Sequence, residues 1–191
     1  MNRSALLSAV AISTFACISS PSLAQHFAKP DPIEPGLVQL GEPVFRLARS
    51  TTSFGAATDG DWLYVMGGYS GRAHDYYYED QSPDFYRVNL FDPGHVEMLP
   101  SGRGMQSCPL EVWDGNVIRT GGLIALNAKG DPQVLRSLDT VQMYSPEEGA
   151  WRDLATLPAG RSSHDTAVHG DTLYVVGGWH LDTESDTREW A

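Results

Sequence analysis

Leu63-Tyr64-Val65-Met66-Gly67-Gly68 decides the fold, because it is the first of three apolar runs that each end in a glycine pair. The second run is Val117-Ile118-Arg119-Thr120-Gly121-Gly122, and the third is Leu173-Tyr174-Val175-Val176-Gly177-Gly178. The pairs begin at positions 67, 121 and 177, so their spacing is nearly constant. A repeat of roughly 50 residues is typical of one supersecondary unit that is stacked several times.

A second set of anchors shows that the whole unit recurs. Leu99-Pro100-Ser101-Gly102-Arg103 returns as Leu157-Pro158-Ala159-Gly160-Arg161, at nearly the same spacing as the glycine pairs. Between these anchors, residues 140–146 alternate apolar and polar side chains, and a turn then leads to Trp151-Arg152-Asp153-Leu154. The first copy has the same order of parts over residues 86–99. Each unit is therefore predicted to form four short antiparallel strands.

The recurring anchors resemble those of the kelch-repeat β-propeller family, in its secreted bacterial and galactose-oxidase-like forms. The resemblance covers residues 45–178. It implies an all-β fold, a β-propeller of kelch type that is present only as an incomplete ring of two full four-stranded blades and half of a third. The implied blades span residues 50–100, 103–158 and 161–191 within a propeller region of residues 44–191. The matching residues are the three glycine pairs, Tyr144, Pro146, Trp151 and the two Gly-Arg pairs at 102–103 and 160–161.

The anchors have simple structural roles in such a unit. A glycine pair at the end of a strand suits a positive φ angle or a close backbone approach. Trp151 offers a flat surface that fills the gap between adjoining blades, and Arg103 and Arg161 can donate to backbone carbonyls at blade corners. These residues define the fold and leave the function open.

The N-terminus has the pattern of a secretion signal. Residues 1–24 contain Arg3, an apolar stretch over residues 5–18 and a small-residue cleavage pattern, Ser22-Leu23-Ala24, so that the mature protein begins near Gln25. We expect a secreted or periplasmic protein with no membrane span after cleavage. A lipid anchor at Cys17 and an uncleaved anchor are the alternatives, although the apolar stretch is shorter than the roughly 20 residues of a membrane span.

Residues 25–43 contain Pro30, Pro32 and Pro35 close together and are predicted to be an extended linker. Residues 43–49 then match the outer strand of a neighbouring blade. A closed propeller has about four to eight blades, and an open one leaves an uncovered sheet edge. We therefore expect this chain to be the N-terminal fragment of a longer protein, whose remainder closes the ring. Self-association of several copies is the alternative.

Cysteine usage excludes an intramolecular disulfide in the mature protein. Cys17 lies in the signal, which leaves Cys108 alone. Cys108 aligns with His164 through the spacing of the second and third glycine pairs. It is predicted to lie in a strand, as a small buried side chain rather than a reactive thiol.

The formal net charge of −11 argues against two classes of partner. No basic stripe is present to displace the counterions of a nucleic acid, and an anionic membrane surface would repel the chain. Acidity of this kind is typical of a soluble exported protein.

The insertion over residues 69–86 is the main binding candidate. It combines clustered tyrosines with charged groups, a mixture that serves in sugar and peptide surfaces. We expect it to lie on one face with the shorter segment 123–138 and the acidic segment 180–189. Packing of the tyrosines onto their own blade is the alternative. The candidate binding residues are Arg72, His74, Tyr76, Tyr77, Tyr78, Glu79, Asp80 and His180.

A metal site is a second possibility, because His180, Asp182, Glu184 and Asp186 stand at alternate positions. The segment lacks the glycine turn of a calcium loop, so we predict a solvated acidic loop, no metal ligands and no cofactor. No catalytic triad, phosphate loop, zinc signature or nucleotide fingerprint is present either.

Two function classes remain. The first is a non-catalytic exported propeller that binds a protein or a carbohydrate. The second is an exported sugar enzyme, because kelch-like propellers include copper-dependent sugar oxidases and sialic acid mutarotases. The oxidases need a tyrosine joined to cysteine, and no such constellation is readable around Cys108. The mutarotase reading rests on fold and export alone. The sequence thus favours a binding protein over an enzyme.

Overall fold

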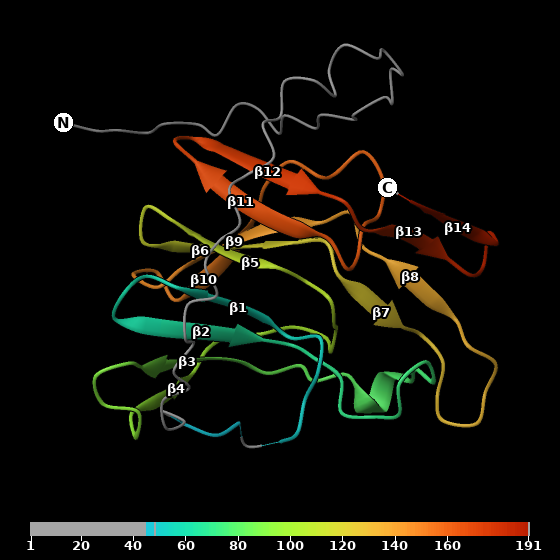
Figure 1. Cartoon of the computed structure of the whole chain (residues 1–191), viewed down its shortest axis with the longest axis horizontal. Helices are drawn as coiled ribbons and strands as arrows, with labels where there is room; N and C mark the ends of the chain where they lie inside the picture. The colour runs from blue at the N-terminus through green and yellow to red at the C-terminus, as the bar shows by residue number, and fades with distance from the viewer. Residues whose placement is uncertain (1–44, 48, 191) are drawn as a thin grey trace, which may run out of the picture.

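The computed structural model describes residues 45–47 and 49–190, and these form β-strands connected by turns (Figure 1). Its one helical segment is a single 3-10 turn, η1 (Tyr78–Asp80). The prediction of an all-β fold is therefore confirmed. The expected signal peptide and linker lie outside the described residues.

Blade 1 is a four-stranded antiparallel sheet in the order β1-β2-β3-β4. Side chains of β2 and β3 that point toward blade 2 are buried, among them Tyr64 and Phe85. The strands are β1 (Gly55–Thr58), β2 (Trp62–Met66), β3 (Phe85–Asn89) and β4 (Val96–Met98).

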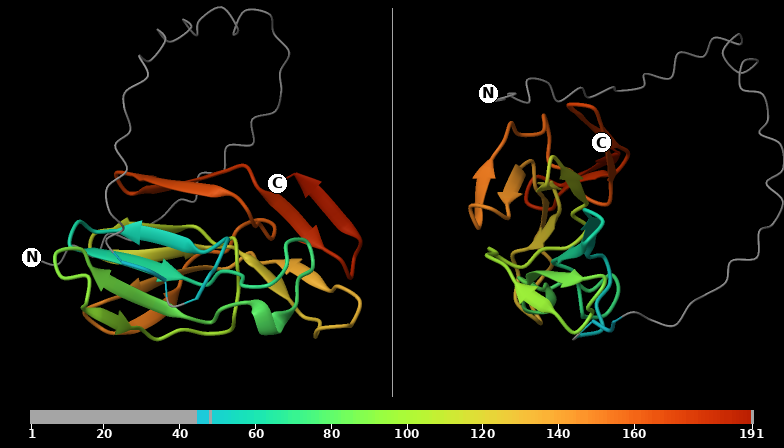
Figure 2. Two further views of the ribbon diagram at one scale, coloured as in Figure 1. Left: turned by 60° about the horizontal axis from the view of Figure 1, so that its bottom comes forward. Right: turned by 90° about the vertical axis from the view of Figure 1, so that its left-hand side faces the viewer.

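Blade 2 repeats this order, from the inner to the outer strand, as β5-β6-β9-β10. Its strands are β5 (Leu110–Trp113), β6 (Asn116–Thr120), β9 (Val141–Ser145) and β10 (Ala150–Asp153). The third unit begins with the hairpin β11 (Asp165–His169) and β12 (Thr172–Val176). The described residues thus contain two full blades and half of a third, without a closed ring, as the sequence predicts (Figure 2).

The segments 123–138 and 180–189 differ from the loops that were expected. Each is a hairpin, and the two hairpins join edge to edge into one sheet in the order β14-β13-β8-β7. The prediction of loops is wrong because both segments contain apolar residues that pack together on one face of this sheet, namely Leu123, Ala125 and Leu135 with Leu181. The strands are β7 (Leu123–Ala125), β8 (Leu135–Ser137), β13 (Trp179–Asp182) and β14 (Thr187–Trp190).

The core lies between the blades. Tyr64 and Phe85 of blade 1 pack with Tyr144 of blade 2, and Trp151 closes the gap against Phe85, with ring centroids 5.1 Å apart. The Trp151 indole also donates to the Pro100 carbonyl, over 2.7 Å. The prediction that Trp151 fills the space between adjoining blades is confirmed.

A chain of backbone hydrogen bonds runs from blade to blade where the inner strands begin. The amide of Ser107 donates to the carbonyl of Ser53, and the amide of Ser163 donates to the carbonyl of Ser107. All three serines have positive φ angles, between 52° and 55°. Such angles are uncommon in residues other than glycine, and here they turn each backbone toward the next blade.

A polar side chain makes a second inter-blade contact in each junction. The Gln81 amide donates to the Leu123 carbonyl and accepts from the Ala125 amide. Ser137 stands at the equivalent position of the next repeat, and its hydroxyl contacts the Trp179 carbonyl and the Leu181 amide. We call Gln81 and Ser137 the connector residues.

The Gly-Arg anchors are not in structural register. The amide of Gly68 bonds to the Met105 carbonyl, and that of Gly122 bonds to the Arg161 carbonyl. Arg161 is therefore the equivalent of Met105 in the preceding repeat, and not of Arg103. Both arginines nevertheless donate to carbonyls as predicted, Arg103 to Ala125 and Arg161 to Gly177.

The expected pairing of residues 43–49 as the outer strand of a neighbouring blade stays a prediction, because part of this segment lies outside the described residues. Residues 45–47 have no strand pairing, and Leu47 and Arg49 lie against blade 1. Residues 43, 44 and 48 lie outside the described part of the chain.

Candidate functional site

A cavity of about 640 Å³ opens where the inner strands of all three blades begin. Gly55, Leu110 and Asp165, the first residues of β1, β5 and β11, line it together with Gly177 and Gly178. Its volume falls within the range of about 300–1,000 Å³ that small-molecule sites have. We call it the axial cavity.

The axial cavity and the insertions share one end of the blades. Each insertion follows a glycine pair, and each glycine pair lies beside the start of an inner strand. Figure 1 shows η1, β7, β8, β13 and β14 gathered at the right-hand end of the molecule. The sequence expectation that the three insertions share one face is therefore met. We call this the loop end.

Three serine hydroxyls line the axial cavity, one from each blade. They belong to Ser53, Ser107 and Ser163, whose backbone groups form the inter-blade chain. Within the described residues none of these hydroxyls forms a hydrogen bond to another protein group. A hydroxyl can donate and accept, so the cavity wall offers both functions to a ligand.

His164 is the most unusual polar group of the cavity wall. It is 9% exposed, and neither ring nitrogen has a hydrogen-bond partner among the described residues. Burial and the nearby positive charge of Arg161 lower the pKa of His164 to about 4, against a smaller opposing effect of Asp165. The imidazole is therefore neutral at pH 7, and buried polar groups without partners are rare in proteins.

Cys108 occupies the equivalent position in blade 2. It is 1% exposed, and burial raises the pKa of its thiol to about 11, so the thiol is protonated at neutral pH. The prediction of a small buried side chain is confirmed. Its placement in a strand was wrong, since Cys108 precedes β5, in the segment that turns toward the cavity.

The insertion of blade 1 packs onto the hairpin of blade 2 as well as onto its own blade, where Tyr69 pairs with Thr52. Tyr76 covers the apolar cluster of β7 and β8, and its carbonyl accepts from the Asn127 amide. Lys129 Nζ lies 2.6 Å from Asp80 Oδ1, and the Lys129 backbone amide donates to Glu79. Tyr77 bonds to the carboxylate of Asp75, and this hydrogen bond raises its pKa.

The other candidate residues keep more of their surface free. Arg72, His74 and Tyr78 are exposed, with half of the Tyr78 side chain accessible. His180 pairs with Glu189 across the hairpin, 3.0 Å apart. The structure therefore brings the eight candidates to the loop end, but it gives Tyr76, Glu79 and Asp80 structural contacts.

The acidic segment does not gather its side chains around one point. Asp182 and Glu184 both approach Arg136, and a turn follows β13, so the alternation of His180, Asp182, Glu184 and Asp186 ends there. In the part of the chain that the structure describes, no group of three or more His, Cys, Asp and Glu side chains is placed to hold a metal ion.

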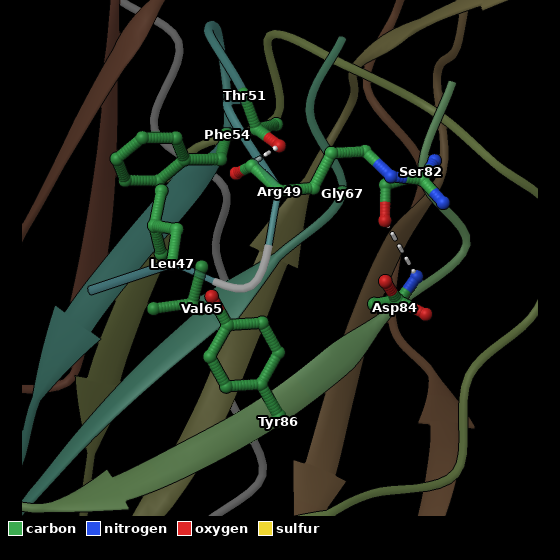
Figure 3. A pocket seen from close by; sticks show the side chains of 9 residues that line it. All are labelled: Leu47, Arg49, Thr51, Phe54, Val65, Gly67, Ser82, Asp84 and Tyr86. Carbon is green, nitrogen blue, oxygen red and sulfur yellow. Dashed lines mark hydrogen bonds between the residues drawn. The ribbon is translucent and has the colours of Figure 1, made fainter. Parts of the chain in front are cut away.

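A second, smaller cavity of about 40 Å³ lies on the face of blade 1 that is turned away from blade 2 (Figure 3). Leu47 and Phe54 border it beside Val65 and Tyr86. This volume suits a water molecule or two, so the small cavity is not a ligand site.

Comparisons with known proteins point to one repeat family. A segment of 102 residues is 32% identical to N-acetylneuraminate epimerase of Haemophilus influenzae, over 51% of this chain and 26% of that protein. A segment of 126 residues is 30% identical to Kelch-like protein 33 of Homo sapiens, over 64% of this chain and 21% of that protein. Kelch-like protein 13 of Mus musculus is 33% identical over 116 residues, which cover 56% of this chain and 17% of that protein.

The chain is a kelch-repeat protein. No protein-family profile matches it. The solved structure of YjhT shares its fold with a TM-score of 0.53 at 23% identity, over 68% of this chain and 35% of that one. This kelch chain spans about a quarter or less of the length of the curated relatives described above.

Sequence reasoning missed three features of the loop end in this kelch protein. The cavity-lining serines, His164 and the connector residues all lie just outside the apolar runs that mark the strands. The spacing of the second and third glycine pairs was a usable signal for the serines, since it relates Ser107 to Ser163. Among the described residues, no helix is long and apolar enough to cross a membrane.

Proposed function

We propose that this kelch protein is an exported, non-catalytic module that binds a carbohydrate at its loop end. The observation that carries the proposal is the axial cavity, with its serine hydroxyls and the unpartnered imidazole of His164. Buried polar groups that lack partners favour a ligand that supplies them.

The insertion supplies the second part of the proposed surface. Its contacts with the blade 2 hairpin fix its position at the same end of the blades as the cavity, so binding need not order a loose loop. Tyr78 remains half exposed and offers an aromatic face against which a sugar ring can stack. The alternative ligand is a protein. It would be favoured if binding used the flat surface of the loop end and not the axial cavity.

Titration calorimetry of the full chain against a panel of glycans and peptides tests the proposal. We expect Tyr78→Ser to weaken glycan binding roughly fivefold or more with little change in Tm, because its ring is exposed. Phe91→Ser, at an 80% exposed residue beyond β3, is the matched control and should leave binding intact. Failure of every glycan to bind the unaltered chain would refute the proposal, and binding of peptides alone would replace the ligand class.

A combined variant separates recognition from packing within the insertion. Replacement of all three tyrosines, Tyr76, Tyr77 and Tyr78, by serine should abolish binding. The accompanying fall in Tm should come mainly from Tyr76, because its side chain covers the apolar cluster of β7 and β8. Retained binding with a large fall in Tm would show that the tyrosines serve packing alone.

Export is part of the proposal and has its own measurement. N-terminal sequencing of the protein recovered from the medium or periplasm should begin near Gln25. Recovery in the cytoplasm with residues 1–24 intact would contradict it.

A second candidate function is catalytic, and one observation favours it. The chain is similar to N-acetylneuraminate epimerase over 102 residues. At the junction between blades 2 and 3, burial raises the pKa of Glu111 and lowers that of His164. Oppositely shifted groups are what acid and base catalysis needs. An NMR assay of anomer interconversion in N-acetylneuraminate, with and without the protein, decides between enzyme and binding module.

A further inference from the structure

His164 stands where the repeat otherwise places an apolar side chain. The equivalent residues are Phe54 in blade 1 and Cys108 in blade 2, by the spacings of the glycine pairs. All three line the axial cavity. Packing at this position is thus compatible with apolar groups, so the buried imidazole of His164 is not needed to hold the blades together.

The ring of His164 fits into space that two glycines leave open. A Cβ at Gly121 would lie 2.9 Å from the Cε1 atom of His164, and a Cβ at Gly178 would lie 2.7 Å from its Cβ atom. The side chain is therefore held between blades 2 and 3. A half-turn about the Cβ–Cγ bond exchanges Nδ1 with Cδ2 and Nε2 with Cε1 at nearly constant ring shape. Both nitrogens are buried in the present orientation of the ring, and the half-turn brings them to the positions where carbons now lie.

Few charged groups face the ring. Arg161 is engaged with the Gly177 carbonyl, Asp165 accepts from the Thr166 amide, and the thiol of Cys108 is protonated at neutral pH. Glu111 is directed to Thr166. None of these groups is hydrogen-bonded to the imidazole. A neutral imidazole has one donor and one acceptor, which is the complement of a hydroxyl group.

We infer that His164 is the specificity-determining residue of the axial cavity, and that it selects neutral, hydroxylated sugars over acidic ones. This inference rests on the proposed carbohydrate function. A hydroxyl can donate to the bare ring nitrogen or accept from the N–H, so two hydroxyls of a sugar can pair with both nitrogens, whereas a carboxylate can pair only with the N–H. The chain's net charge of −11 further disfavours an anionic ligand.

Two variants at this position test the inference in the full chain. His164→Phe introduces the residue that stands at the equivalent place in blade 1 and removes both nitrogens. His164→Gln keeps one donor and one acceptor. With N-acetylglucosamine and galactose as neutral probes at pH 7, we expect His164→Phe to lose roughly tenfold in affinity and His164→Gln to lose less than about threefold.

The remaining measurements separate the possible failures. The ¹⁵N shifts of His164 should change on addition of a neutral sugar, which a structural role alone would not cause. Equal binding of neutral sugars by His164→Phe and the unaltered chain would overturn the inference and leave the proposed function standing. Preference of the unaltered chain for N-acetylneuraminate would also overturn it. Absence of binding to any sugar would refute the proposed function itself, and this inference with it.

Discussion

The junction between blades 1 and 2 and the junction between blades 2 and 3 share a backbone scheme but not a core. Both contain the serine backbone bond and a connector residue. The first junction is aromatic, with Phe85, Tyr144 and Trp151 in contact, whereas the second is mainly aliphatic and contains His164. Stacking is thus specified by backbone contacts, and the side chains between blades are free to differ in size and polarity.

The largest expected effect on stability comes from truncating side chains in the cores of the two junctions. Phe85 and Val141 are equivalent residues of successive repeats, and both are buried. Phe85→Ala should lower the free energy of unfolding by about 3–5 kcal/mol, and Val141→Ala by roughly 2 kcal/mol, because the cavity left behind is smaller. Urea unfolding measures both, with the exposed Phe91→Ala as control. Equal losses at the two sites would break the comparison.

The glycine pair of the third unit separates backbone strain from steric conflict. Gly177 and Gly178 have φ angles of 67° and 97°. A side chain at Gly178 would collide with His164 and Ser162, whereas the space at Gly177 is open. We expect Gly178→Val to destabilise by about 3 kcal/mol and Gly177→Val by about 1–2 kcal/mol. If neither variant melts lower than the unaltered chain, this view of the pair is wrong.

His164 makes the second junction sensitive to acid. Its pKa is about 4 in the folded chain and about 6.5 when unfolded, so the unfolded state takes up the proton first as the pH falls. The stability contribution of His164 is present above pH 6.5 and is lost between pH 6.5 and pH 4, by about 3 kcal/mol at most. Unfolding at a series of pH values checks this.

The control for that pH series lies in the same hairpin. His164→Phe should flatten the decline between pH 6.5 and pH 4, and His169→Phe, at an exposed position of β11, should keep it. A decline that is the same in all three proteins would place the acid sensitivity outside the second junction.

The connector residues should have the smallest and most nearly equal effects. Gln81→Ala and Ser137→Ala each leave a backbone carbonyl and amide of the next blade without a side-chain partner. We expect a loss of about 1 kcal/mol for each, because the contacts are equivalent. Gln133→Ala, which removes an exposed bond to the His74 carbonyl, should change stability by less than about 0.5 kcal/mol. A large difference between the two connectors would show that they are not equivalent.

Much of the fold could be predicted because its signals are periodic side chains. The glycine pairs, Trp151 and the alternating strands recur at fixed spacing, and repetition identifies them as parts of one unit. The connector residues escaped notice because Gln81 and Ser137 differ in type while they contact equivalent backbone groups. Contacts to backbone groups can be made by several types of side chain, so the residue type alone does not reveal them.

The loop end was predicted only in part for a related reason. The positions of the insertions followed from the glycine pairs, but the edge-to-edge union of β8 with β13 depends on geometry between blades. The tyrosines suggested a free binding surface, yet Tyr76 is taken up by the neighbouring hairpin. In the sequence, His164 stood out only because it aligns with Cys108 in the repeat. That its ring nitrogens lack hydrogen-bond partners could be seen only in the structure.

The connector residues also bear on the order in which the blades can form during synthesis. Gln81 and Ser137 each reach backbone groups 42 and 44 residues further along. At about 5–20 residues per second, each blade waits roughly 2–9 s for its successor to be synthesised. During that interval the face of the blade that will later contact its successor is exposed to solvent, and the side chain of its connector residue is hydrogen-bonded to water. We therefore expect the blades to assemble in sequence from the N-terminus, with each newly made hairpin supplying the contacts of the connector before it.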